Sequence, residues 1–290
     1  MKACVFFIFY FFAASLLAAL FCYPLYLLFT EQTFLFERWV SRFALLFLIL
    51  GLIPCIKYFK LSLKSLGHNA STYLYIKQVS IGFAVGLVIL ALLISSLLAL
   101  DIRLINPSAT LSSALLIKSL IAGLIIALIE ETLFRGLFFK LTLKWHNALT
   151  AVVVSSFFYA ILHFIKPIDH IDQNTLTIYS GAEVLLNAFI GLMSMQISDF
   201  AALFAVGTLL ALVRFKTNSL TFCIGLHASW VFLIKSSKQL TDSNPHSDWS
   251  FLTGHYDGIV GWLAFAWLML LSLVYLMYIN NSSNNPQPKR

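Results

Sequence analysis

The stretch that decides the fold is the apolar run Leu111–Phe139, LSSALLIKSLIAGLIIALIEETLFRGLFF, which holds Glu130, Glu131 and Arg135. A charged side chain at the centre of a membrane helix costs roughly 2.5–3.5 kcal/mol on insertion scales. Ionisable residues kept at such a cost normally face a protein-lined cavity and serve a function there. We therefore expect EETLFR to lie at a functional site within a membrane-spanning helix.

The composition of the chain supports a membrane protein. Hydrophobic residues make up 60% of the 290 residues and charged residues only 11%, against about 25% charged in soluble domains. Because about 20 apolar residues span a bilayer, the sequence predicts an all-α, polytopic membrane protein with about eight transmembrane helices. The predicted segments are 5–29, 43–56, 79–100, 110–138, 148–165, 199–213, 219–234 and 259–278.

Some of these segments are short for a full span. Segments 43–56, 199–213 and 219–234 are either tilted partners in thinned bilayer or buried core helices. The stretch 183–197 is interpreted as a partial helix at the interface or re-entering the membrane. The first segment follows Lys2 and is longer than the core of a cleaved signal peptide, so we expect a retained signal anchor.

Three regions are predicted from the same pattern. Residues 1–109 hold N-terminal transmembrane helices without a signature, 110–235 hold the EETLFR stretch and the helices that follow it, and 236–290 contain an outer loop, the last helix and a polar tail. The tail, 280–290, is expected to be disordered. The four cysteines show no paired spacing, which indicates neither a disulfide framework nor a thiolate metal site.

Basic residues predict the orientation. With the N-terminus inside, the inner segments carry eleven Lys and Arg and no acid, whereas the outer segments carry six cations and ten acids. Both termini are therefore expected in the cytoplasm, and the net charge of +7 is an orientation signal that requires no nucleic-acid partner. A compact polytopic chain without long extra domains is typical of a bacterial inner-membrane protein.

The spacing within EETLFR predicts different roles for the two glutamates. Residues four apart share a helix face, so Glu131 and Arg135 are expected to form an ion pair. Glu130 points about 100° away and is expected to stay unpaired, and a carboxylate kept from water is a better base near neutral pH. The alternative is a structural Glu–Arg clasp between helices.

Two histidines follow within predicted membrane segments. His163 ends the fifth segment, one turn after Tyr159, and His227 lies in the seventh, in GLHASWVF. A lone membrane histidine is most often a packing residue, but two histidines with a carboxylate pair favour a site. Glu130, His163 and His227 could hold a divalent metal such as zinc or activate water without one. The His and Asp residues of the outer loops are better explained by solvation than by metal binding: Asp169, His170, Asp172, His246, His255 and Asp257.

These motifs resemble the CAAX-processing and bacteriocin-processing (CPBP) intramembrane proteases, which include type II CAAX prenyl endopeptidases, lysostaphin-resistance and bacteriocin-immunity proteins. EETLFR is similar to the family's Glu-Glu-x-x-x-Arg signature, Tyr159-Ala-Ile-Leu-His163 to its Phe-x-x-x-His motif, and His227 to the start of His-x-x-x-Asn/Asp. The resemblance covers roughly 110–235, with three motifs in the correct order. Val231 departs from it, because the family usually has Asn or Asp there.

The resemblance implies an eight-helix protease with a catalytic cavity. In that picture Glu130 and His163 activate water, His227 stabilises the oxyanion, and Glu131 with Arg135 holds the first glutamate in place. The substrate would be a membrane-embedded or lipidated peptide or protein, in contact with membrane lipids. Loss of one oxyanion donor at Val231 lowers the rate on the order of a hundredfold, unless Ser229, Asn218 or Asn187 substitutes.

Two other functions remain open at the level of sequence. One is a non-catalytic immunity or scaffold protein of the same fold that binds a membrane partner. The other is a proton-coupled transporter that uses Glu130 and Glu131 as a relay. A transporter should show paired inverted halves or helices broken at matching positions, and the sequence shows neither.

Overall fold

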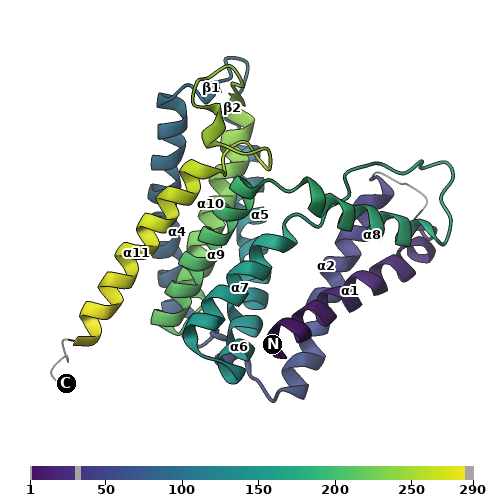
Figure 1. The fold of residues 1–290 in the computed structure, drawn as a ribbon, viewed down its shortest axis with the longest axis horizontal. Coiled ribbons are helices and arrows are strands. Elements are labelled where there is room, and N and C mark those ends of the chain that lie inside the picture. The colour runs from purple at the N-terminus through teal and green to yellow at the C-terminus, as the bar shows by residue number, and fades with distance from the viewer. Residues whose placement is uncertain (1, 30–33, 285–290) are drawn as a thin grey trace. The chain divides into compact units, whose positions relative to one another are not determined.

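The computed structural model describes residues 2–29 and 34–284, and in this part the chain is helical apart from one small two-stranded ribbon (Figure 1). Six helices there are long and apolar enough to cross a membrane, and two shorter apolar helices accompany them. These helices indicate a polytopic integral membrane protein. The six are Lys2–Tyr26, Phe36–Tyr58, Thr72–Ala99, Ser113–Trp145, Ile197–Thr217 and Trp262–Asn281.

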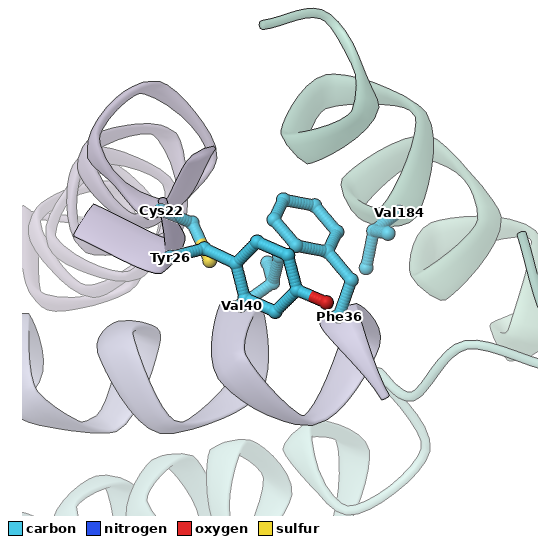
Figure 2. Close-up of a cluster of buried hydrophobic side chains, with 5 residues drawn as sticks. All are labelled: Cys22, Tyr26, Phe36, Val40 and Val184. Carbon is cyan, nitrogen blue, oxygen red and sulfur yellow. The ribbon is translucent and has the colours of Figure 1, made fainter. Parts of the chain in front are cut away.

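The chain forms two compact units, of which the smaller comprises Met1–Ser62 and Ile161–Met195. In it α1 (Lys2–Tyr26) packs against α2 (Phe36–Tyr58) and α8 (Ser180–Ile190). Figure 2 shows the apolar cluster in which the three helices meet, and Phe36 at its centre is fully buried. The cluster consists of Cys22 and Tyr26 from α1, Phe36 and Val40 from α2, and Val184 from α8.

The larger unit comprises Leu63–Ala160 and Gln196–Arg290 and is centred on α10 (Thr221–Leu240), which packs against α4 (Thr72–Ala99) and α5 (Ser113–Glu131). Glycines permit this close approach: a Cβ on Gly82 of α4 would lie 2.7 Å from the Phe222 carbonyl oxygen of α10. Small residues at membrane helix interfaces let backbones approach in this way. On the other side, α9 (Ile197–Thr217) packs against α11 (Trp262–Asn284).

One end of the larger unit is closed by a ribbon in which β1 (Arg103–Ile105) pairs antiparallel with β2 (Thr241–Ser243). Arg103 is 3% exposed and donates hydrogen bonds to the Thr241 carbonyl and the Gly258 carbonyl. The ribbon thereby fixes the loop that precedes α11. It is the only regular structure besides helix in the described residues.

Each predicted segment corresponds to a helix, but several boundaries differ. Segments 43–56 and 199–213 are parts of α2 and α9, which are 23 and 21 residues long and are not short for a span. Hydropathy marks only the lipid-facing part of a helix, whereas backbone hydrogen bonding continues into the polar residues at its ends. Segment 219–234 corresponds to α10, and the partial helix 183–197 to α8 followed by one 3₁₀ turn, Gly191–Ser194.

Two further predictions need correction at helix ends. The fifth segment is the shorter α7 (Ala148–Leu162), so His163 follows the helix instead of lying within it. The tail expected to be disordered from residue 280 is helical as far as Asn284, because α11 continues to that residue. The remaining tail residues, 285–290, lie outside the described part of the chain.

Candidate active site

The two glutamates lie at a change of helix geometry. Glu130 and Glu131 are the last residues of α5, and the seven residues that follow, Thr132–Phe138, form a π-helical turn that continues into α6 (Phe139–Trp145). A π-helix is rare and appears mostly as a single turn within an α-helix, frequently at a functional site. Arg135 lies in the middle of this turn and is fully buried.

Glu131 is the centre of a buried hydrogen-bonded cluster. Its Oε1 accepts a hydrogen bond from Arg135 Nη1 at 3.0 Å and lies 2.8 Å from His227 Nδ1 on α10. The side chains of Glu131 and Arg135 are both 0% exposed and that of His227 is 5% exposed. The ion pair predicted from the i, i+4 spacing is therefore confirmed, and a histidine from a distant helix joins it.

The contact with Glu131 orients the His227 ring. A carboxylate oxygen accepts hydrogen bonds, so Nδ1 carries the proton that it donates to Glu131. Nε2 then faces Glu130, whose Oε2 lies 3.8 Å away. The side chain of Glu130 is 25% exposed. The expectation that Glu130 stays unpaired is wrong, because the distant α10 brings His227 against it.

Neighbouring helices hold Arg135 from two further directions. Its Nη2 donates to the Gly207 carbonyl of α9 at 3.3 Å, and its Cζ lies 4.3 Å from the ring centroid of Tyr159 on α7. The Tyr159 ring also meets the His227 ring edge-on at 5.9 Å between centroids. A guanidinium over a desolvated aromatic face contributes up to about 2 kcal/mol. The Tyr159 ring thus contacts both the Arg135 guanidinium and the His227 imidazole.

Sequence reasoning missed the Gly207 carbonyl, because a backbone acceptor has no sequence signature. The glycine itself was a usable signal, since glycine within a membrane helix marks close helix contact. A Cβ on Gly207 would lie 2.8 Å from the Cα of Ser156 on α7. This close contact between α7 and α9 encloses the guanidinium of Arg135.

His163 was predicted to join this site. It is the first residue after α7, is partly buried, and belongs to the smaller unit, whereas Glu130, Glu131, Arg135 and His227 belong to the larger one. The structure therefore gathers four of the five predicted residues in one unit. Among residues 2–29 and 34–284, no group of three or more His, Cys, Asp or Glu side chains is arranged to hold a metal ion.

The three residues considered as substitutes for the donor missing at Val231 make local contacts. The Ser229 hydroxyl donates to the Leu226 carbonyl of its own helix, and Asn218 Oδ1 accepts from Arg214. In the smaller unit, Asn187 Oδ1 accepts the backbone N–H groups of 168 and 169. None of these interactions points to a role in stabilising an oxyanion.

Tyr256, in the loop before α11, is a second residue that the sequence did not reveal. Burial raises the pKa of its hydroxyl, and the negative charges of Asp257, Glu130 and Asp199 raise this pKa further. Its backbone N–H donates to Asp199 Oδ2 at 3.1 Å. Tyr256 also lines a cavity of about 740 Å³. It therefore places a phenol group within electrostatic range of Glu130.

Two of the outer-loop residues considered as metal ligands stabilise turns instead. Asp257 Oδ1 accepts the backbone N–H groups of Ile259 and Val260, and Asp172 Oδ1 accepts that of Asn174. The His170 side chain is 78% exposed, with Nδ1 3.6 Å from Glu37 Oε1. These contacts agree with the interpretation of a solvated loop.

The fold and the buried Glu–Arg–His cluster together define an integral membrane protein with an acid–histidine site between its helices. Residues 112–233 match the family model described as Type II CAAX prenyl endopeptidase Rce1-like. This part of the chain is therefore a domain of the Rce1-like type II CAAX prenyl endopeptidase (CPBP) family, which confirms the resemblance inferred over 110–235. No curated protein and no solved structure matches the chain.

Proposed function

We propose that the protein is an intramembrane endopeptidase that hydrolyses a peptide bond in a membrane-embedded or lipidated substrate. The observation that carries this proposal is the contact of one imidazole, His227, with both glutamates of the EETLFR motif, inside the domain of the family. Membership of a CAAX-type family supports peptide or protein substrates. The restriction to membrane-delivered substrates follows from the depth of the glutamates within an apolar helix.

Glu130 is the proposed general base. It accepts a proton from water as the water oxygen attacks the scissile carbonyl, and returns this proton to the amine as the C–N bond breaks. Its partial exposure gives access to water that the fully buried Glu131 lacks. In this proposal His163 helps to hold the attacking water. Support for that role comes from the family motif and from its position four residues after Tyr159, which contacts Arg135 and His227.

His227 is the proposed donor to the developing oxyanion. With Nδ1–H directed at Glu131, Nε2 is the ring nitrogen that faces Glu130, and it donates to the oxyanion when it also carries a hydrogen. Glu131 and Arg135 orient the ring and are positioning residues. The proposed steps use only these side chains and a water molecule.

The test is reconstitution of the purified chain in lipid nanodiscs with a library of fluorogenic peptides, with and without a prenyl group. Wild type is compared with Glu130→Gln and with Glu183→Gln, the same change at an exposed carboxylate of α8. We expect Glu130→Gln to abolish cleavage and Glu183→Gln to retain it. A chelator should leave the wild-type rate unchanged. Equal cleavage by Glu130→Gln and wild type would refute the assignment.

Val231 favours a second candidate, a non-catalytic membrane protein of the same fold. Valine has no group that can donate to an oxyanion, and the three proposed replacements are engaged elsewhere. The same nanodisc preparation distinguishes the two functions. A binding protein would retain a partner after Glu130→Gln, whereas a protease would lose its turnover.

A further inference from the structure

The loop after α3 (Leu63–Leu66) contacts the π-helical turn of the site, together with the end of α9. We call this group the latch and define it as the backbone of Leu66 and Gly67 with the side chains of His68 and Arg214. All four residues belong to the larger unit. None of them is part of the family motifs considered above.

Arg214 bridges the loop and the π-helical turn. Its Nε donates to the backbone carbonyl of Arg135 at 3.2 Å, and its Nη2 donates to the Leu66 carbonyl, also at 3.2 Å. Its Nη1 donates to Asn218 Oδ1 at 3.0 Å. The residue is 2% exposed, so these hydrogen bonds compete with no bulk water. A charged donor on a buried carbonyl is among the stronger hydrogen bonds in proteins.

The hydrogen bond of Arg214 is one of two that join α9 to Arg135. The Gly207 carbonyl accepts from the side chain of Arg135, while Arg214, seven residues later, donates to its backbone. Seven residues are about two turns, or roughly 10.5 Å along the helix. One rigid helix therefore fixes both the backbone and the guanidinium of the residue that pairs with Glu131.

His68 makes the second contact of the latch with the turn. Its Nε2 lies 3.0 Å from the hydroxyl of Thr132, the residue directly after Glu131. That hydroxyl donates its hydrogen to the Leu128 carbonyl at 2.6 Å, so it accepts from His68, and Nε2 carries a proton. Burial and the charge of Arg214 lower the pKa of His68, which favours the neutral ring with its proton on Nε2.

The loop can adopt this shape only with glycine at position 67. Gly67 has a φ of +113°, and a Cβ there would lie 3.1 Å from Arg214 Cζ and 2.9 Å from Leu220 Cγ. The Gly67 carbonyl accepts the backbone N–H of Leu220 at 3.0 Å, which connects the loop to the start of α10. The latch is thus joined to α9, α10 and the π-helical turn.

We propose that Arg214 and His68 are positioning residues of the active site, which hold the π-helical turn so that Glu131 and Arg135 orient His227 against Glu130. The inference rests on the proposed peptidase function. A rare backbone geometry persists when the surrounding structure fixes it at several points, and the latch supplies contacts at Thr132 and at Arg135. A displacement of about 1 Å at a reacting group costs on the order of 100-fold in rate.

The experiment compares Arg214→Lys with Lys216→Arg in nanodiscs. Both changes keep the charge and lie in the last turn of α9, but Lys216 is exposed and contacts the Tyr278 ring. A lysine ammonium lacks the planar, forked donors with which the Arg214 guanidinium reaches the Arg135 and Leu66 carbonyls at the same time. At equal folded fraction, we expect Arg214→Lys to lower kcat by roughly 10–100-fold with KM within about twofold. Lys216→Arg should change neither.

Substitutions at His68 provide an independent test of the same proposal. In His68→Gln the amide can still donate to Thr132, whereas in His68→Leu no donor remains. We expect kcat to be largely retained in the glutamine variant and to fall in the leucine variant. Equal kcat in wild type, Arg214→Lys and His68→Leu would overturn the proposal.

Hydrogen–deuterium exchange separates this proposal from the proposed function. Arg214→Lys should accelerate amide exchange in peptides covering 128–139, and Lys216→Arg should not. If wild type cleaves no substrate but this difference is seen, the latch stands as a positioning device and the peptidase assignment fails. If exchange over 128–139 is unchanged in Arg214→Lys, the latch proposal fails whatever the activity.

Discussion

Replacing Arg135 with methionine should lower the free energy of unfolding by about 3–5 kcal/mol, the usual cost of removing one partner from a buried ion pair. The Glu131 and Arg135 side chains are both 0% exposed, and Nη1 lies 3.0 Å from Oε1. Methionine fills much of the volume of the arginine but leaves the Glu131 carboxylate without its cation. The hydrogen bond to the Gly207 carbonyl and the contact with the Tyr159 ring are lost as well.

A double mutant isolates the electrostatic part of that loss. In Arg135→Met combined with Glu131→Gln no buried charge remains in the pair, and the glutamine Oε1 still accepts the proton of His227 Nδ1. Replacement of a buried ion pair by neutral residues is often close to neutral in stability. We therefore expect the double mutant to be more stable than Arg135→Met alone, with a coupling energy of about 2–3 kcal/mol.

The measurement is reversible unfolding in mixed micelles, followed by the fluorescence of the six tryptophans. Lys118→Met is the control, because it removes an exposed cation from the same helix. It should change the free energy of unfolding by less than about 0.5 kcal/mol. Additive effects of the two substitutions, with a coupling energy near zero, would refute the reasoning that the pair is electrostatically linked.

Three further outcomes are expected. Gly82→Ala should destabilise the fold, since the new Cβ would lie 2.7 Å from a carbonyl oxygen of α10, whereas Gly136→Ala, with its nearest atom at 3.5 Å, should be tolerated in the same unfolding assay. Tyr256→Phe should reduce kcat by roughly 10–100-fold if its hydroxyl replaces the missing oxyanion donor, and an unchanged kcat would exclude that role. The lowered pKa of His68 means that the unfolded chain binds its proton more readily, so stability should fall as the pH drops below about 6.5. A pH titration of unfolding should show this loss in wild type and not in His68→Gln.

The sequence predicted the positions of the helices well because hydrophobicity marks apolar helices, but of the eight predicted spans only six correspond to described helices long and apolar enough to cross a membrane. It predicted their ends poorly. The apolar part of α2 begins near residue 43, yet the helix begins at Phe36, where Glu37 is buried and its Oε1 accepts the backbone N–H of Ile171. A contact between residues 134 positions apart thus keeps a polar first turn helical, and no local pattern contains that information.

The same distinction between local and distant contacts applies to the site. The ion pair of Glu131 and Arg135 follows from helix periodicity and was predictable. The contact of Glu131 with His227 joins residues 96 positions apart, and only the family motif indicated that they would meet. The π-helical turn was not predictable, because contacts with Gly207, Arg214 and His68 fix it and no composition specifies it.

The two adjacent glutamates show how one helix produces two chemical environments from identical side chains. A rotation of about 100° per residue turns Glu131 towards Arg135 and His227, where it is fully buried, and leaves Glu130 partly exposed beside the same imidazole. A carboxylate that must exchange protons with water needs access to it, whereas one that orients a ring benefits from exclusion of water, which strengthens its hydrogen bonds. The difference in exposure is thus the physical basis for assigning proton transfer to Glu130 and positioning to Glu131. Because His227 contacts both carboxylates, a displacement of the π-helical turn would disturb the two roles together.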